Sequence, residues 1–161
     1  MITIYLNLKM RIILILLLFP FSLIAQDDLR IIDGDTIHLN GDKIRFSGID
    51  TPEINQMCKK DEIDIPCGEI AKELLIKKIG NTVPICILED KDQYGRILGE
   101  CYIGEESLSS YLVREGFAFA YTRYSKKFVE DEQFAIKNKS GMWSMDFIFP
   151  WDFRKNKYKY K

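Results

Sequence analysis

Short apolar segments separated by polar turns occupy much of the chain after residue 25. Three of them alternate apolar and polar residues as β-strands do, and Asp-Gly-Asp and Asn-Gly-Asp turns separate them. Two further apolar segments flank a turn at residues 92–95 and predict a second hairpin. The pattern therefore predicts five strands, at residues 29–32, 36–40, 43–49, 83–89 and 96–103.

Apolar residues with helical spacing occur in three other places. Residues 68–79 carry a stripe formed by Ile70, Ala71, Leu74, Leu75 and Ile79. Further helices are expected at residues 107–115, before Gly116, and at about 127–139. The order of three strands, helix, two strands and helices is compatible with a five-stranded Greek-key barrel of the oligonucleotide-binding (OB) type, an α+β fold. The pattern alone does not fix this topology.

The first 25 residues have a different character from the rest. Lys9 and Arg11 precede an unbroken apolar run at residues 12–19, and small or turn-prone residues follow it. This arrangement predicts a signal peptide at residues 1–25, and Met10 is an alternative start. The run is short for a membrane span, which needs about 20 apolar residues. We therefore expect a secreted or periplasmic protein, with an uncleaved N-terminal membrane anchor as the alternative.

Composition and charge divide the remaining chain into one compact domain at residues 26–146 and a basic, aromatic tail at residues 147–161. Removing residues 1–25 leaves 21 basic and 24 acidic residues, a net charge of −3. Nucleic-acid binders usually carry a basic footprint, so such binding would need local positive charge or a metal-centred site. The tail is expected either to be solvated or to contact nucleic acid or a membrane.

Four cysteines that follow a secretion signal favour disulfides over metal ligation. Folding the second hairpin symmetrically about the bond between residues 93 and 94 places Cys86 opposite Cys101. Directly opposed residues of antiparallel strands have Cα atoms about 4.5 to 5.5 Å apart, which suits a disulfide. We therefore predict the disulfides Cys86–Cys101 and Cys58–Cys67, with four free thiols as the alternative.

Acidic and basic side chains gather in three short segments near the ends of predicted strands. They are Asp33 and Asp35 in IIDGDT, Arg45, Asp50, Thr51 and Glu53 in RFSGIDTPE, and Arg96 in DQYGR. Carboxylates can hold a hard cation, a further carboxylate can activate water, and guanidinium groups can bind a phosphate. Each motif alone is better explained as a structural turn, a surface glutamate or a surface ion pair. Together they indicate phosphodiester hydrolysis.

This combination of motifs resembles the staphylococcal nuclease (thermonuclease) family. The resemblance runs from about residue 31 to residue 144 and includes IIDGDT, R-x4-DTPE, DQYGR, LVREGFA and SGMWS. It implies an OB-fold barrel with three helices. It also implies a calcium-dependent phosphodiesterase that cuts DNA and RNA and leaves 3'-phosphates and 5'-hydroxyls.

The resemblance assigns the metal and the general base to particular residues. It implies that the carboxylates of Asp35 and Asp50 and the carbonyl of Thr51 bind calcium. Glu53 is then the general base that accepts a proton from the attacking water. Asp33 matches the first acid of its motif, and we expect it behind the metal ligands rather than in direct coordination. With one histidine in the chain, zinc is a poor alternative.

The remaining positions match groups that contact the substrate. Arg45 and Arg96 correspond to the phosphate-binding arginines, and Tyr94 and Tyr121 to tyrosines that contact the nucleotide. Gln93 departs from the pattern, because the best-known enzyme of the family has a lysine there. The cysteine pair at residues 58 and 67 likewise replaces a mobile basic loop of that enzyme.

Two other functions are compatible with some or all of the same residues. A nuclease-like barrel could only bind nucleic acid or a protein, but such a module would not need the metal acids, the base and both arginines together. A general phosphodiesterase of nucleotides or sugar phosphates would use the same site. We expect a monomer with DNA and RNA as substrates and no obligate protein partner.

Overall fold

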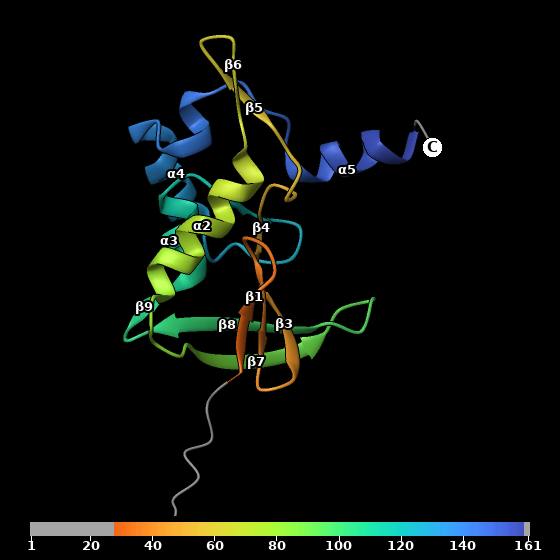
Figure 1. Ribbon diagram of the computed structural model, residues 1–161, viewed down its shortest axis with the longest axis vertical. Helices are drawn as coiled ribbons and strands as arrows, with labels where there is room; N and C mark the ends of the chain where they lie inside the picture. Colours follow the sequence, from red (N-terminus) through yellow and green to blue (C-terminus); the bar gives the residue numbers. More distant parts are fainter. Residues whose placement is uncertain (1–27, 160–161) are drawn as a thin grey trace, which may run out of the picture.

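The computed structural model describes residues 28–159 (Figure 1). The expected signal peptide at residues 1–25 lies outside these residues. Within the described part, no helix combines the length and the apolar character needed to cross a membrane.

A curled sheet forms one layer of the molecule, with β7 and β8 crossing β1 and β3 in Figure 1. Its strands are hydrogen-bonded in the order β1, β2, β3, β8, β7, and a short strand, β9, pairs with β8. β3 and β8 run parallel, whereas the other neighbours are antiparallel. The bounds are β1 Leu29–Ile31, β2 Thr36–Leu39, β3 Asp42–Phe46, β7 Ile85–Lys91, β8 Ile97–Ile103 and β9 Glu106–Ser107. This curled half-barrel confirms the expected OB-type fold.

Local turn chemistry explains the two hairpins of this sheet. Between β2 and β3, Asn40 and Gly41 have φ angles of 51° and 91°, the left-handed conformation that a tight two-residue hairpin turn requires. In the β7–β8 hairpin, Cys86 lies opposite Cys101 and Leu88 opposite Gly99, as the symmetric folding predicted. The register shifts beyond Leu88, so that Lys91 rather than residue 90 lies opposite Ile97.

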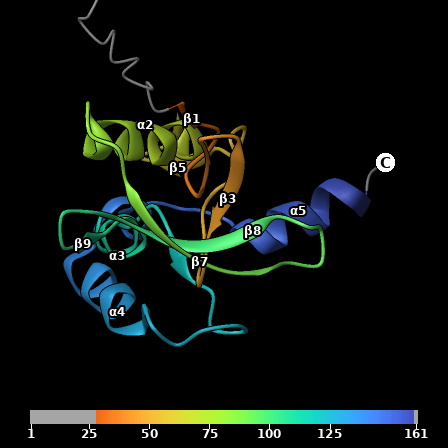
Figure 2. The same ribbon diagram turned by 90° about the horizontal axis from the view of Figure 1, so that it is seen from below.

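Four α-helices lie in the described chain, one more than expected. Figures 1 and 2 show α2, α3 and α4 gathered at one end of the sheet, while α5 extends on the other side. Two short strand pairs, β4 with β10 and β5 with β6, and the 3-10 helix η1 complete the fold. The bounds are α2 Cys67–Ile79, α3 Leu108–Arg114, α4 Val129–Asn138, α5 Pro150–Lys159, η1 Gly141–Ser144, β4 Ile49–Asp50, β5 Cys58–Lys60, β6 Ile63–Ile65 and β10 Phe119–Ala120.

The main core lies between the inner face of the sheet and helices α2 and α3. Ile37 and Phe46 project into it from the sheet, and Leu75 and Leu112 meet them from the two helices. All four side chains are almost completely buried. Burying apolar area in this way is the main source of the fold's stability.

A second hydrophobic cluster is built around Phe119 of β10. Its ring lies within 5.1 to 6.0 Å of the rings of Trp143, Phe147, Phe149 and Trp151. The first part of the aromatic tail is therefore packed against the domain, and the expectation of a solvated tail is wrong for these residues. The reason is that alternate aromatic side chains there cover a buried strand.

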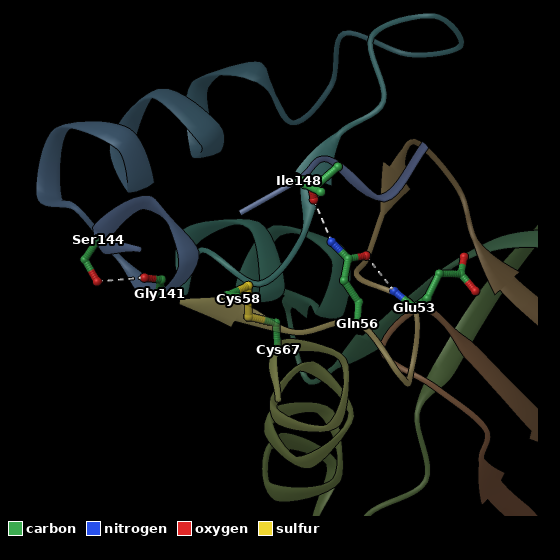
Figure 3. The surroundings of a disulfide bond; sticks show 7 residues. All are labelled: Glu53, Gln56, Cys58, Cys67, Gly141, Ser144 and Ile148. Carbon is green, nitrogen blue, oxygen red and sulfur yellow. Dashed lines mark hydrogen bonds between the residues drawn. A yellow bond between two sulfur atoms is a disulfide. The ribbon is translucent and has the colours of Figure 1, made fainter. Parts of the chain in front are cut away.

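Both predicted disulfides are present, and the described residues include no free cysteine. Cys86–Cys101 joins β7 to β8. Cys58–Cys67 joins β5 to the first turn of α2, as Figure 3 shows. The second bridge therefore ties the segment after Glu53 to the helix that packs beneath it.

Two stretches differ from the expected elements. The third predicted strand divides into β3 and β4, because the chain turns at Ser47 and at Gly48, whose φ is 74°. Residues 50–66, where the sequence pattern predicts neither a strand nor a helix, contain the β5–β6 hairpin. Its turn is made by Asp61 and Glu62, both with positive φ, in place of the usual Asn-Gly pair.

Candidate active site

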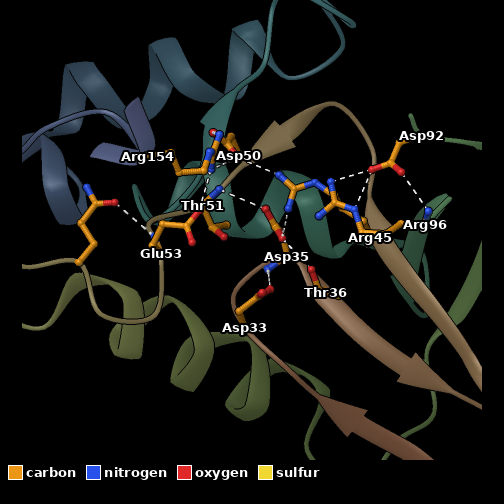
Figure 4. A network of polar contacts seen from close by, with 11 residues as sticks. Asp33, Asp35, Thr36, Arg45, Asp50, Thr51, Glu53, Asp92, Arg96 and Arg154 are labelled. Atoms are coloured by element: carbon orange, nitrogen blue, oxygen red, sulfur yellow. Dashed lines mark hydrogen bonds and ion pairs between the residues drawn. The ribbon is translucent and has the colours of Figure 1, made fainter. Parts of the chain in front are cut away.

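Six of the polar residues singled out in the sequence meet where β2 begins and where β3 and β4 end (Figure 4). The turn between β1 and β2 carries two of them, β3 and β4 carry one each, and the segment after β4 carries the last two. They are Asp33, Asp35, Arg45, Asp50, Thr51 and Glu53. The structure thus brings together residues from two of the three sequence segments, IIDGDT and RFSGIDTPE, while their chemical roles remain predictions.

Arg45 joins the two buried carboxylates of this cluster. Its NH1 donates to Oδ1 of Asp35 at 2.6 Å, and its NH2 donates to Oδ1 of Asp50 at 2.7 Å. The Asp35 residue is 2% exposed and Asp50 is fully buried. Two carboxylates placed this close to each other in a core would repel, and the guanidinium fork balances that repulsion.

The backbone around Asp35 fixes the direction of its carboxylate. Oδ2 of Asp35 accepts from the backbone N–H of Thr51 at 3.3 Å, and Oδ1 also accepts from the Thr36 hydroxyl at 3.0 Å. Behind it, Oδ1 of Asp33 accepts from the backbone N–H of Asp35 at 3.1 Å. Asp33 therefore holds the turn that carries Asp35, and its expected place behind the metal ligands stays a prediction.

Burial and neighbouring negative charges raise the pKa values of two acids of this site, Asp33 and Asp50. Burial, together with the charge of Asp35, raises the pKa of Asp33 to about 6. Burial also raises the pKa of Asp50, and the guanidinium groups of Arg154 and Arg45 oppose that rise. The site therefore concentrates negative charge where water is scarce, which is the electrostatic condition that favours a bound cation.

Glu53 lies in a half-exposed loop that is held from two sides. Its backbone N–H donates to Oε1 of Gln56 at 3.2 Å, and Nε2 of Gln56 donates to the carbonyl of Ile148 at 2.6 Å (Figure 3). Its carboxylate Oε1 accepts from Arg154 NH1 at 2.9 Å. Both contacts reach the C-terminal segment, so the position of Glu53 depends on residues 148–154.

Arg96 and Tyr94 lie on the turn between β7 and β8. Arg96 donates from Nε and NH2 to Oδ2 of Asp92, both at 2.7 Å. Oδ1 of Asp92 accepts the backbone N–H groups of Tyr94 and Arg96, each at 2.9 Å. Tyr94 is 75% exposed. The structure therefore places this arginine and tyrosine together on an ion-paired turn, and Figure 4 draws Arg96 in the same view as Arg45 and the Asp35 and Asp50 carboxylates.

Tyr121 follows β10 and faces the C-terminal segment. Its ring stacks on Trp151, with centroids 6.0 Å apart and planes 13° apart, and Tyr124 lies 5.0 Å away. The ring is half-buried. A nucleotide that contacted Tyr121 would therefore meet a surface that the tail helps to form.

Arg154 was not anticipated from the sequence. It lies in α5 and donates to both oxygens of Asp50 as well as to Glu53 (Figure 4). Burial works against its charge, but the carboxylates of Asp50 and Glu53 raise its pKa overall. Its sequence neighbourhood is simply basic, so no local signal distinguishes it from the lysines around it.

The donor set of the cluster is small for a metal site. Within residues 28–159, no group of three or more His, Cys, Asp or Glu side chains could hold a metal ion. The expected site needs only two carboxylates and the Thr51 carbonyl. In the described hydrogen bonds, Oδ2 of Asp35 and Oδ2 of Asp50 each accept one donor, which leaves each a further lone pair. Hard oxygens of this kind suit calcium, so the residues fit it.

Comparisons with known proteins agree with this geometry. The family model described as "Staphylococcal nuclease homologue" matches residues 43–145. The chain is 30% identical over 118 residues to staphylococcal-like nuclease CAN1 of Arabidopsis thaliana, covering 71% of this chain and 34% of that protein. It is 35% identical over 129 residues to the SPbeta prophage-derived endonuclease YokF of Bacillus subtilis, covering 71% of this chain and 42% of that protein. The chain thus spans less than half of these two relatives.

A shorter relative matches along most of its length. An Escherichia coli protein named as an uncharacterized endonuclease is 31% identical over 156 residues, covering 89% of this chain and 96% of its own.

Proposed function

Because the chain belongs to the staphylococcal nuclease family, we propose that it is a calcium-dependent endonuclease that hydrolyses phosphodiester bonds of DNA and RNA. The observation that carries this proposal is the cluster formed by Asp35, Arg45, Asp50 and Glu53. It unites hard oxygen ligands, a guanidinium group and a carboxylate with an unshared oxygen in one place.

Calcium would be held by the carboxylates of Asp35 and Asp50 and the carbonyl of Thr51. When bound, it would supply positive charge that polarises the phosphate and the attacking water. Arg45 fixes the relative position of the two carboxylates before any ion arrives. The site is therefore preorganised, which lowers the reorganisation needed during the reaction.

Glu53 acts as the general base of the proposed reaction. Its Oε1 is engaged by Arg154, so Oε2 remains to accept a proton from the attacking water. The new bond forms between the water oxygen and phosphorus, and the bond from phosphorus to the 5'-oxygen breaks. A proton returns to that oxygen, and the products are a 3'-phosphate and a 5'-hydroxyl.

Arg45 and Arg96 bind the phosphate from two sides in this proposal. Arg45 already lies within the acidic cluster. Arg96 uses Nε and NH2 for Asp92, which leaves NH1 to donate to a phosphate oxygen. Tyr94, on the same turn, contacts the nucleotide next to that phosphate. Arginine suits this role because its planar fork matches the geometry of a phosphate.

We also propose that the protein works outside the cytoplasm. The two disulfides support this, because such bridges persist in oxidising compartments. Cleavage of residues 1–25 would release a secreted or periplasmic enzyme, and we propose that it acts as a monomer. If residues 1–25 were retained, they would attach the enzyme to a membrane.

The experiment that tests this function is hydrolysis of single-stranded DNA and of RNA by the purified, oxidised protein, with calcium or with a chelator. Glu53→Gln keeps the shape of the side chain and removes its basicity, so turnover should fall by about 10²-fold or more. Glu105→Gln, at an exposed position in the turn after β8, is the matched control and should keep full turnover.

The outcomes separate this enzyme from a binding module. Calcium-dependent cutting that Glu53→Gln loses and Glu105→Gln keeps would establish the nuclease and its base. A folded protein that binds DNA in calcium but leaves every phosphodiester bond intact would instead be a nucleic-acid-binding barrel. Cleavage of mononucleotide diesters but not of polymers would indicate a general phosphodiesterase.

A further inference from the structure

Arg154 connects the two carboxylates that would bind the metal and activate the water. NH2 of Arg154 lies 2.6 Å from Oδ2 of Asp50, and NH1 lies 3.2 Å from Oδ1 of Asp50 and 2.9 Å from Oε1 of Glu53. The Arg154 side chain is 33% exposed. One planar guanidinium group therefore sets the distance and the orientation between these two acids.

The fold delivers Arg154 through a rigid connection. Pro150 begins α5 and is buried, and the ring of Trp151 stacks on Phe149 with centroids 4.6 Å apart and planes 9° apart. Trp151 also packs against Phe119. Phe119 is paired with Asp50 in the β4–β10 ladder. The helix that carries Arg154 is thus anchored to the strand that carries Asp50.

We propose that Arg154 is a positioning residue of the nuclease site, an inference that rests on the function proposed above. Its guanidinium group holds the base Glu53 at a fixed distance and orientation from the metal ligand Asp50. It acts through these two carboxylates rather than on the reacting atoms. It ties up Oε1 of Glu53 and thereby selects Oε2 as the oxygen that accepts the proton.

The charges of the cluster give this role a distinctive signature. Asp33, Asp35, Asp50 and Glu53 carry a formal charge of −4, and Arg45 and Arg154 reduce it to −2, which one divalent cation balances. Without Arg154 the charge is −3, so a cation should bind more tightly. Removing Arg154 should therefore tighten calcium binding while it slows the chemistry.

A residue that only stabilised the fold would behave differently. Its removal would loosen the cluster, so calcium affinity, turnover and melting temperature would fall together. A C-terminal helix that merely obstructed the metal would behave in a third way, because its loss would tighten calcium binding and leave turnover unchanged or faster. The direction of the two effects distinguishes the three cases.

The test compares Arg154→Gln and Arg154→Lys with wild type in the full chain. Lys155→Gln is the matched control, because the neighbouring Lys155 side chain is 71% exposed and pairs only with Asp152 among the described residues. Calorimetry measures calcium affinity without substrate, and steady-state cutting of single-stranded DNA gives kcat and KM. Melting temperatures show whether each variant is folded.

We expect Arg154→Gln to lower kcat by roughly 10-fold to 100-fold with little change in KM, as loss of a residue supporting a metal site typically does. Its calcium affinity should rise by about threefold to tenfold. Arg154→Lys keeps the charge but cannot bridge two carboxylates with a fork, so calcium affinity should return to the wild-type value and kcat only in part. Lys155→Gln should match wild type.

Unchanged kcat in Arg154→Gln would overturn the inference while leaving the proposed function intact. Weaker calcium binding together with a lower melting temperature would also overturn it, since that result indicates a purely structural arginine. Failure of the wild-type protein to cut DNA in calcium would overturn the proposed function, and the positioning role with it. The wild-type reaction therefore distinguishes the two failures.

Discussion

Replacing Gly68 by alanine should move the loop that carries Glu53, the proposed base, without altering a charged group. Gly68 is the second residue of α2, and its backbone N–H donates to the carbonyl of Gln56 at 3.2 Å. A β-carbon there would lie 1.9 Å from the carbonyl oxygen of Glu53 and 2.7 Å from Cα of Ile54. Ordinary contacts begin at 3.4 Å, so the helix and the loop would have to separate by about 1.5 Å.

The loop should yield rather than the helix. The first residue of α2, Cys67, is bonded to Cys58, and the next turn packs Ala71 into the core with no exposed surface. Glu53 would therefore be displaced by on the order of 1 Å, which typically costs about 10²-fold in rate. Stability should change less, because alanine favours the helix by up to about 1 kcal/mol while overpacking costs about 1 to 3 kcal/mol.

The assay is kcat on single-stranded DNA beside the urea unfolding curve of the same preparation. Gly104→Ala is the control, because Gly104 has a φ of 60° and no atom within 4 Å of the added carbon. It should lose about 1 to 2 kcal/mol from backbone strain and keep its kcat. Wild-type kcat in Gly68→Ala would refute the reasoning, since the base would then tolerate displacement of its own backbone.

Three further predictions concern stability. Reducing both disulfides should lower the free energy of unfolding by about 2 to 4 kcal/mol for each bridge, since each closes a loop between residues 9 or 15 apart; an unchanged urea midpoint in reductant would contradict this. Phe119→Ala should cost about 3 to 5 kcal/mol, measured by urea unfolding, because this fully buried ring touches four other aromatic rings. Burial raises the pKa of Glu132 against a hydrogen bond from the backbone of Ala120, so its folded form binds the proton more tightly than the unfolded chain does. Its contribution to stability is then greatest below the ordinary pKa and falls as pH rises through the folded pKa. The free energy of unfolding of Glu132→Gln should therefore increase relative to that of wild type as the pH rises through the folded pKa of Glu132. If the two proteins show the same pH dependence of the free energy of unfolding, the shift is contradicted.

Local chemistry explains why much of the fold was predictable from sequence. The position of the turn predicts the register of the β7–β8 hairpin near the cysteines, and that register places Cys86 opposite Cys101. The β5–β6 hairpin was missed because its turn residues, Asp61 and Glu62, adopt positive φ without the Asn-Gly signal. Tertiary contacts, including the bridge from Cys58, hold that turn instead.

The acidic cluster was predictable for a related reason. The β2–β3 hairpin pairs Thr36 with Arg45 and so brings Asp35 beside Arg45, while Asp50 follows β3 directly after the short turn at residues 47 and 48. Arg154 is 104 residues from Asp50, and its approach depends on how the rings of the second cluster stack. Because Arg154 lies among other basic residues, nothing in the local sequence distinguishes it as the residue that makes this contact. The sequence therefore indicated the acids of the site but not the full set of cations that hold them.

The site has two parts that differ in rigidity, and this difference suits the proposed reaction. Asp35 and Asp50 are buried and fixed by Arg45 and by backbone contacts, so their geometry is set when the protein folds. Arg96 lies on the β7–β8 turn, where its guanidinium is ion-paired with Asp92 and lies over the ring of Tyr94. An incoming phosphate can compete for this guanidinium more readily than for that of Arg45, because the Arg96 side chain is 30% exposed and the Arg45 side chain 17%. Substrate binding should therefore rearrange the β7–β8 turn and leave the buried carboxylates where folding placed them.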